Sequence, residues 1–439
     1  MRQTPLPRHP GADLTQDETS AVGWDVIRAT GCRTPSLGGY DVAVGIQVRT
    51  LLIGAVSALV IGGGLPATAA AAPAAAPRWS AAELPDGDTV LSGSIRPDAH
   101  TTWTAGFRLG DEDGSGSFHP VVYTHDDRTD GPWTAMPTAP GALGRVNALA
   151  ATSARDGWLV GDTDREGDPV MTQHWNGHTW RVEPAPVPQD TISGGLLGVD
   201  ALTPDNVWAA GWAQVLDERI PDPDGGPTQI IDHSEGLVEH WDGHTWHRVP
   251  LPKQYANWGL NAIAASGPND IWAVGSGYGD DDRPVVLHYD GRSWTALPTP
   301  PYGGLYGEFN DVIAKGPHDV WAVGRTLLDE DDRGHALTMH WNGRTWTPLD
   351  RPADAGPLTG AAATRDGIVA VGMTHDRENG YALRVAGTRV TSLGFPAGTD
   401  GTAYSPWKIS AAGREVTVSG SLTSPKEQFP RPLLLSTRL

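Results

Sequence analysis

The amino-acid sequence predicts an all-β fold, a seven-bladed β-propeller built from four-stranded antiparallel blades. Three observations support this prediction. The chain of 439 residues contains 55 Gly, 37 Pro and 18 Trp, and no stretch keeps a helical hydrophobic period over about a dozen residues. A strand-like phrase recurs about every 50 residues, which is typical of propeller repeats. An eight-residue phrase around Asn-Gly or Asp-Gly follows it in the best copies.

The recurring strand-like phrase ends in a glycine, and most copies have a tryptophan three residues earlier. Clear copies are RDGWLVG, DNVWAAG, NDIWAVG and HDVWAVG, and degenerate copies are HTTWTAG, GIVAVG and EVTVSG. The final glycines are Gly106, Gly161, Gly211, Gly275, Gly324, Gly372 and Gly420. One blade for each copy gives the predicted number of blades.

Each unit is expected to contain four strands, called a to d from the inside of the ring outward. In the fourth unit these are residues 261–265, 271–277, 285–289 and 293–298. The phrase EHWDGHTW, residues 239–246, and its copies QHWNGHTW, LHYDGRSW and MHWNGRTW span strand c, a turn and the start of strand d. Asn-Gly and Asp-Gly predict a two-residue type I′ turn, in which both residues take positive φ. The Trp after the turn is expected to pack against the neighbouring blade.

The two ends of the repeat region are predicted to meet in one blade. The seventh unit has candidates for strands b and c, and the chain then stops at Leu439 without a strand d. The segment RWSAAELP, residues 78–85, precedes the first unit and is similar to the strand d sequence SWTALP. We therefore expect residues 78–85 to complete the last blade and close the ring, which removes two open sheet edges.

Charge and cysteine content exclude several classes of partner and site. The formal net charge is −20, which repels nucleic acid and acidic membranes, so neither is expected as a partner. The single cysteine, Cys32, allows no internal disulfide and no cysteine zinc cluster. We expect a monomer without a resident cofactor, with calcium as the one ion considered.

The N-terminal region predicts export. Residues 48–77 combine a basic start at Arg49, an apolar stretch at 51–65 and an Ala/Pro-rich segment with small-residue cleavage sites. This pattern indicates a secretory signal and linker, with a retained membrane anchor as the alternative. Residues 1–47 are expected to be a disordered extension, or to lie before a true translation start near Val48. The mature, extracellular protein is then the propeller of residues 78–439.

The hairpin phrases resemble a known motif. WNGHTW and WDGHTW resemble the Asp-box of sialidases and related secreted propellers, although the turn is one residue tighter and the leading Ser is missing. The whole unit is similar to secreted bacterial propellers grouped with kelch and galactose-oxidase-type domains, without the paired glycines of a kelch repeat. The resemblance covers residues 78–439 and implies a secreted propeller, but it assigns no chemistry.

Variable loops at one end of the ring are the predicted place of function, because the b–c and d–a loops differ between blades while the other turns repeat. The b–c loops are acidic. Candidate calcium ligands are Asp111, Asp113, Ser115, Asp162, Asp164 and Glu166. The alternative is a solvated acidic rim, which the missing closing Glu of an EF-hand loop favours.

The d–a loops contribute aromatic side chains. Stacking rings beside acidic and amide groups suit a sugar ligand, and the candidate ligand-binding residues are Tyr255, Trp258, Tyr302, Tyr306, Tyr404 and Trp407. The alternative is that these rings attach long loops to the blades. Three inner-strand amides, Asn147, Asn261 and Asn310, either bind a ligand at the channel mouth or, as we favour, cap their strand.

Four histidines occupy one strand c position in different blades: His174, His240, His288 and His340. Packed sheets lie about 10 Å apart, so equivalent side chains cannot converge on one metal ion, and we predict that all four are structural.

Three functions remain open. The favoured one is a non-catalytic binding module for an extracellular glycan or surface protein, because GxSxG, HExxH, P-loop and GxGxxG patterns are absent. The second is a glycan-active enzyme, a sialidase-like hydrolase or lyase at the loop end of the ring, with Glu308, Tyr306 and Arg325 as its residues. The third is a structural scaffold between proteins.

Overall fold

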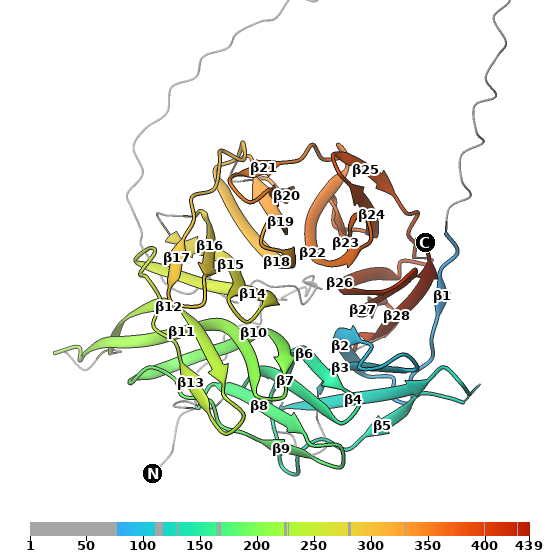
Figure 1. Ribbon diagram of the computed structural model, residues 1–439. Helices are drawn as coiled ribbons and strands as arrows, with labels where there is room; N and C mark the ends of the chain where they lie inside the picture. Colours follow the sequence, from blue (N-terminus) through green and yellow to red (C-terminus); the bar gives the residue numbers. More distant parts are fainter. Residues whose placement is uncertain are drawn as a thin grey trace, which may run out of the picture. The chain divides into compact units, whose positions relative to one another are not determined.

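Seven four-stranded antiparallel sheets are arranged as the blades of a β-propeller (Figure 1), which confirms the predicted fold class. The computed structural model describes residues 77–109, 117–129, 131–163, 165, 168–223, 226, 228–279, 282–329, 331–398, 400–427 and 429–439. No helix in these ranges is long and apolar enough to span a membrane.

The strands follow the chain from the inner to the outer edge of each blade. Blade 1 contains β2 (Thr89–Ile95), β3 (Thr101–Leu109), β4 (Phe118–Asp126) and β5 (Thr134–Met136). Blade 2 contains β6 (Arg145–Ser153), β7 (Asp156–Asp162), β8 (Val170–Trp175) and β9 (Trp180–Val182). Blade 3 contains β10 (Thr191–Thr203), β11 (Asn206–Ile220), β12 (Gln229–Trp241) and β13 (Trp246–Arg248). Blade 4 contains β14 (Asn257–Gly267), β15 (Asp270–Tyr278), β16 (Pro284–Tyr289) and β17 (Trp294–Ala296).

The remaining blades repeat this pattern. Blade 5 contains β18 (Tyr306–Gly316), β19 (Asp319–Leu327), β20 (His335–Trp341) and β21 (Trp346–Pro348). Blade 6 contains β22 (Ala355–Thr364), β23 (Gly367–Thr374), β24 (Gly380–Ala386) and β25 (Arg389–Ser392). Blade 7 contains β26 (Ala403–Ala412), β27 (Glu415–Thr423), β28 (Arg431–Arg438) and, as its outer strand, β1 (Ser80–Ala81).

Strand b is buried on both sides, which explains its continuous apolar sequence. In β15, Ile271 and Ala273 pack in the cluster shared with blade 3, while Trp272 and Val274 pack in the cluster shared with blade 5. Alternate residues of a strand point to opposite faces, so a blade between two neighbours needs apolar residues at every position. The hydrophobic core therefore lies between blades, as a series of sandwiched layers.

The segment that precedes the first blade closes the ring with the C-terminal strand, as predicted. In β1, Ser80 pairs with Ser436 and Ala81 with Leu435 of β28. The amide of Ala82 adds a hydrogen bond of 2.9 Å to the Leu434 carbonyl. The paired strand is only two residues long, shorter than the expected segment 78–85.

The repeated hairpin differs from the predicted type I′ turn. Pairing of β12 with β13 stops at Trp241 and Trp246, so residues 242–245 form a four-residue loop. The Asp242 carboxylate accepts 2.9 Å hydrogen bonds from the amides of His244 and Thr245, and only Gly243 takes a positive φ, of 94°. Asp242 therefore stabilises the turn through its side chain and does not adopt the left-handed backbone conformation of a type I′ turn. Trp246 packs edge-on against Trp158 of the preceding blade, with ring centroids 4.9 Å apart, as predicted.

Bulges in the inner strands link one blade to the next. In blades 1, 2, 4, 5 and 6 the bulge residue donates a side-chain hydrogen bond to a carbonyl of the following inner strand. The pairs are Ser92 to Val146, Asn147 to Leu196 at 3.1 Å, Asn261 to Phe309 at 2.9 Å, Asn310 to Leu358 at 2.8 Å and Thr359 to Pro406 at 2.8 Å. Register shifts mark the same positions. The three asparagines therefore join neighbouring blades instead of capping their own strand or meeting a ligand. The corresponding residues in blades 3 and 7 are Leu197 and Trp407.

Candidate functional site

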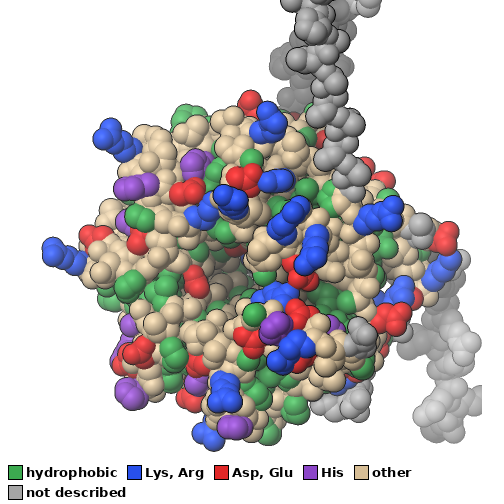
Figure 2. Space-filling model, turned by 45° about the vertical axis from the view of Figure 1, so that its right-hand side comes forward, with side chains coloured by type: hydrophobic (Ala, Val, Ile, Leu, Met, Phe, Trp, Pro, Cys, Tyr) green, Lys and Arg blue, Asp and Glu red, His purple; other side chains and the backbone are tan. Residues whose placement is uncertain are grey.

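The two ends of the ring carry different connections. We call the end with the a–b turns and c–d hairpins the turn face, and the end with the b–c and d–a loops the loop face. Figure 2 shows a face of the molecule that is hollowed near its centre, with basic and acidic side chains around the hollow.

The four repeated histidines lie near the turn face and are structural. His288 stacks on Trp272 of its own blade with ring centroids 4.2 Å apart, and its Nε2 lies 2.7 Å from Asp270 Oδ1. The same arrangement recurs as His174 with Trp158 and Asp156, His240 with Trp208 and Asn206, and His340 with Trp321 and Asp319. Each ring thus has a stacking partner and a hydrogen-bond partner within its own blade, in agreement with the predicted structural role.

A depression of about 520 Å³ opens on the loop face beside blade 5. Its lining comes from the two d–a linkers that flank the blade and from the start of β20. The lining residues are Pro301, Tyr302, His335, Pro348, Leu349, Asp350, Arg351 and Ala353. Apolar rings and side chains thus alternate with a hydroxyl, an imidazole, a carboxylate and a guanidinium, a combination that suits a polar ligand with apolar faces.

Tyr302 is the predicted ligand-binding residue that lines this depression. Its hydroxyl donates a long hydrogen bond of 3.4 Å to the carbonyl of Asp282, which holds the ring in place. Burial raises the pKa of the Tyr302 hydroxyl. Tyr302 is therefore a neutral donor at physiological pH. Tyr255, a second predicted ligand-binding residue, packs against the cluster between blades 3 and 4.

The other predicted aromatics do not form one surface. Trp258 is 3% exposed in the core between blades 3 and 4, where a Cβ atom on Gly236 would lie 2.3 Å from its ring, so Trp258 is unavailable to a ligand. Tyr404 packs on the cluster between blades 6 and 7. Trp407 lies at the inner-strand bulge of blade 7, with its ring 6.4 Å from that of Phe107. Most of these rings therefore pack against the blades and attach the d–a loops to them.

Tyr306, Glu308 and Arg325 come together on β18 and β19. Glu308 and Arg325 are direct cross-strand partners, and their ion pair measures 2.7 Å between Oε1 and Nε. The Tyr306 hydroxyl donates to the second oxygen of Glu308, and the guanidinium lies 5.3 Å above the Tyr306 ring. Burial, followed by the Glu308 charge, raises the pKa of Tyr306, so its hydroxyl keeps its proton. Each group is bound by the other two, and the tyrosine is not activated as a nucleophile.

The candidate calcium ligand that the structure describes is already bound by protein groups. Asp162 is 8% exposed, and its Oδ2 lies 2.7 Å from Arg145 Nη2 while its Oδ1 accepts a 2.8 Å hydrogen bond from Asn147. Both oxygens therefore face donors of the same blade. The other candidates lie outside the described residues: Asp111, Asp113, Ser115, Asp164 and Glu166.

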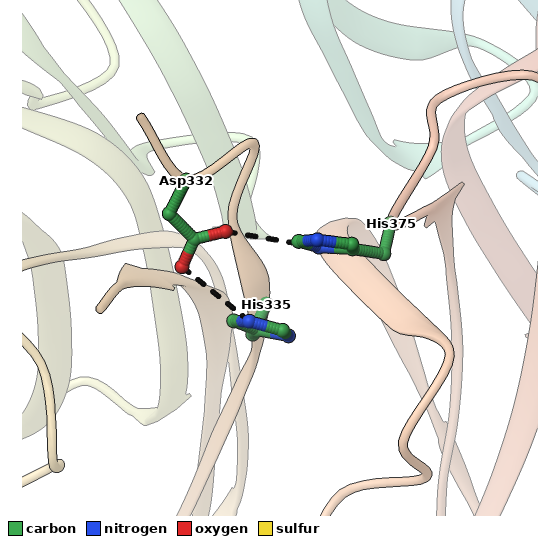
Figure 3. A group of neighbouring side chains, drawn as sticks. All are labelled: Asp332, His335 and His375. Atoms are coloured by element: carbon green, nitrogen blue, oxygen red, sulfur yellow. Dashed lines mark ion pairs between the residues drawn. The ribbon is translucent and has the colours of Figure 1, made fainter. Parts of the chain in front are cut away.

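Three side chains on the loop face could hold a metal ion. Asp332 precedes β20, His335 begins β20, and His375 follows β23 in the next blade. Their ligand atoms all lie within 4.8 Å of one another. Figure 3 shows the Asp332 carboxylate directed at both imidazoles, whose rings stack almost parallel at 9° with centroids 4.4 Å apart. We call Asp332, His335 and His375 the His–Asp cluster.

The electrostatic state of the cluster suits metal ligation. Burial lowers the pKa of His335, opposed by Asp332 and reinforced by Arg351, so the neutral imidazole with a free lone pair predominates at neutral pH. Although burial works against ionisation of Asp332, hydrogen bonds from the amides of Leu328 and Gly334 hold the pKa of its carboxyl below the ordinary value. The sequence alone does not reveal this cluster, because its members belong to two loops in neighbouring blades. The available signal was a histidine at the edge of each of two adjacent acidic b–c loops.

No protein-family model matches the chain, and no curated protein sequence matches it. The Asp-box and kelch resemblances therefore stay predictions. Similar solved structures include YCF48 bound to D1 peptide, at 14% identity over 84% of this chain and 99% of that chain, with a TM-score of 0.48. Another is the Myceliophteria thermophila Cps50 (Swd1) β-propeller domain, at 11% identity over 78% and 98% of the two chains, with a TM-score of 0.44. A third is a mutant of the Aleuria aurantia lectin AAL in complex with Fucalpha1-6GlcNAc, at 11% identity over 71% and 98%, with a TM-score of 0.39. At such levels no residue role passes to this chain.

Proposed function

We propose that this protein is a secreted, non-catalytic binding module whose loop face holds an extracellular glycan. The observation that supports the proposal is the depression beside blade 5, where Tyr302, Arg351 and Asp350 surround an open space of about 520 Å³. A sugar offers hydroxyls to charged groups and C–H faces to a ring, and this lining provides both. The open shape suits part of a chain-like glycan better than an enclosed small molecule.

Export is the second part of the proposal. It rests on the signal-like pattern of residues 48–77, which lie almost entirely outside the described residues. A binding surface that faces extracellular glycans agrees with such a signal. Mass spectrometry of the N-terminus of protein recovered from the culture medium tests this part, and recovery of residues 1–47 on the mature chain would contradict it.

The glycan proposal is tested by probing an array of extracellular glycans with the purified protein, first in calcium and then in a chelator. We expect binding to one glycan family in both conditions, because none of the candidate calcium ligands lines the depression. Arg351→Gln and Tyr302→Ala should each weaken that binding at least about tenfold, which corresponds to about 1.4 kcal/mol. A thermal unfolding curve of each variant establishes that it is folded.

The matched control is Arg365→Gln. Arg365 is an exposed arginine in the a–b turn of blade 6, on the turn face, so it carries the same charge away from the depression. Its substitution should leave glycan binding unchanged. An array without binding in either condition, or equal loss in the Arg351 and Arg365 variants, would reject the depression as a glycan site and leave a protein partner as the alternative.

A glycan-active enzyme is the second candidate, supported by the convergence of Tyr306, Glu308 and Arg325. The glycans that bind the array serve as the substrates to test. Turnover that Glu308→Gln abolishes while binding persists would establish this candidate. We expect no turnover, because the three groups are bound to one another and Tyr306 keeps its proton.

A further inference from the structure

The His–Asp cluster joins two blades at the loop face without being part of the repeated scaffold. The four repeated histidines each stack on a tryptophan of their own blade, whereas His335 and His375 stack on each other across a blade boundary. The three side chains come from the b–c connections of blades 5 and 6, which the propeller brings side by side. Such a cluster requires an explanation other than the packing of one blade.

We propose that Asp332, His335 and His375 form a binding site for a divalent transition-metal ion, with zinc as the ion that fits the ligand set. The site does not depend on the proposed glycan binding.

The distances match those between ligands of one tetrahedral ion. Zinc binds imidazole nitrogen and carboxylate oxygen at about 2.0–2.2 Å, so two ligand atoms in a tetrahedral site lie about 3.4 Å apart. Asp332 Oδ2 lies 3.4 Å from His335 Nε2, the other carboxylate oxygen Oδ1 lies 3.7 Å from His375 Nδ1, and one ligand atom from each of the three side chains lies within 4.8 Å of the others. Binding one ion therefore requires only side-chain rotations that bring one carboxylate oxygen and two imidazole nitrogens together.

Groups outside the cluster hold the carboxylate and one imidazole in place. The Asp332 carboxylate accepts hydrogen bonds of 2.7 Å from the Leu328 amide and 2.9 Å from the Gly334 amide, and its side chain is 5% exposed. His375 Nδ1 lies 3.0 Å from the Gly334 carbonyl, and this contact orients the ring until an ion bound at Nδ1 replaces it. These contacts come from the loop before β20, so one loop positions ligands from two blades.

One atom of the cluster lacks a partner. His335 Nδ1 is buried and makes no hydrogen bond within the part of the chain that the structure describes. A buried polar atom without a partner costs about 1–3 kcal/mol, so its persistence suggests a role that the protein atoms alone do not satisfy. A metal-bound water or a ligand in the adjacent depression, which His335 also lines, would supply that partner.

The ligand types select the ion. Calcium and magnesium require six or more oxygen ligands, which two imidazoles do not provide. Two histidines and one carboxylate are typical of zinc sites with an open fourth position, and of other first-row ions in the same geometry. Arg351, which lines the same depression as His335, opposes a cation, whereas the Asp332 carboxylate favours one.

Equilibrium dialysis of the purified full chain against Zn²⁺, without an affinity tag, tests the site. We expect one tightly bound ion per chain, and at least about a tenfold loss of affinity in His335→Gln, His375→Gln and Asp332→Asn, since each removes one of three ligands. Co²⁺ provides a second readout, because an ion held by these ligands should give the visible absorption of a tetrahedral site and lose it in the variants.

The matched control is His233→Gln. His233 lies on the extended b–c hairpin of blade 3, where its Nδ1 pairs with Asp217 at 2.9 Å in a two-residue histidine–aspartate contact. Its substitution should leave the affinity and the cobalt spectrum unchanged. Absence of stoichiometric Zn²⁺ binding, or equal affinity in the wild type and the His335 and His375 variants, would overturn the proposal. Circular dichroism of every variant separates loss of the site from loss of the fold, and neither result depends on the glycan array.

Discussion

The histidines of the turn face and those of the loop face show how the same side chain takes different roles in one propeller. On the turn face, His288 and its three counterparts each have a tryptophan and an aspartate or asparagine of their own blade as partners. On the loop face, His335 and His375 have each other and one shared aspartate, Asp332, from the loop that leads into His335. Partners within a blade repeat with the sequence, whereas partners across a blade boundary do not. The repeated contacts stabilise the fold, and the unrepeated contact is where a ligand site is expected.

The largest effect should come from the tryptophan under a turn-face histidine. Trp272 is 1% exposed and contacts His288 and Trp346, so Trp272→Ala removes a full aromatic side chain from the layer between blades 4 and 5. We expect the free energy of unfolding to fall by about 3–5 kcal/mol. Urea unfolding followed by tryptophan fluorescence and circular dichroism measures the change, and a loss below about 1 kcal/mol would show that the repeated layer is not the main source of stability.

Glu239 breaks the repeat in strand c, and its effect depends on pH. Its carboxyl is fully buried without a hydrogen-bond partner among the described residues, whereas Gln173 at the same position in blade 2 accepts a 2.9 Å hydrogen bond from the Ala139 amide. Burial raises the pKa of Glu239 to about 8. The folded state therefore keeps a proton that the unfolded state releases above about pH 4.5. The free energy of unfolding should fall by about 1.4 kcal/mol per pH unit from about pH 4.5 to 8 through this group.

Glu239→Gln should remove that slope. We expect the variant to exceed the wild type in stability at pH 8 by a few kcal/mol and to lose the advantage near pH 4.5. Urea unfolding at several pH values measures this, with Glu235→Gln on the same strand as the control, because Glu235 is partly exposed and pairs with Arg248. Parallel pH profiles for wild type and Glu239→Gln would mean that the buried carboxyl is already ionised.

A turn-face histidine should contribute less than its tryptophan. His288→Gln loses ring stacking on Trp272 and the 2.7 Å hydrogen bond to Asp270, while the side chain is about a quarter exposed. We expect a loss of about 1–2 kcal/mol in the free energy of unfolding. The same urea assay measures it, and His178→Gln, an exposed histidine of the blade 2 hairpin, serves as the comparison. Equal values for the two variants would contradict a structural role for His288.

A loop-face histidine should contribute least to metal-free stability. The His375 side chain is 41% exposed and belongs to a b–c loop rather than to a blade layer. In the presence of a chelator, His375→Gln should change the free energy of unfolding by no more than about 0.5 kcal/mol. A loss as large as that of His288→Gln would show that the cluster is structural and would remove the contrast between the two faces.

The sequence predicts the fold well because the determinants of a blade are local. In the sequence, the tryptophan and glycine of strand b recur from blade to blade, as does the hairpin phrase. The segment that closes the ring is similar in sequence to strand d of another blade. The hairpin conformation is predicted wrongly because Asp242 fills the turn through its carboxylate, an alternative that the Asp-Gly pair does not reveal. The site is predicted less well because the exposure of a side chain depends on the neighbouring blade. Trp258, for example, is buried because Gly236 of blade 3 has no side chain and leaves room for its ring. Likewise, His335 and His375 meet only because two loops become neighbours in the ring.

The border between blades 7 and 1 is held together differently from the others. The fully buried apolar residues of the cluster there are Leu91, Tyr123 and Leu434 among the described residues, with four partly buried residues packed against them, and Trp407, in contact with Phe107, takes the place of an inner-strand hydrogen-bond donor. The Tyr123 hydroxyl donates a 2.8 Å hydrogen bond to Asp86, and Arg96 pairs with Glu415 at 2.7 Å across this border. Because salt screens this partly exposed ion pair but not apolar contacts, high ionic strength should favour opening of the ring at this border. Amide hydrogen exchange should then accelerate first in β1 and β2, and this one seam would set the rate at which the ring unfolds.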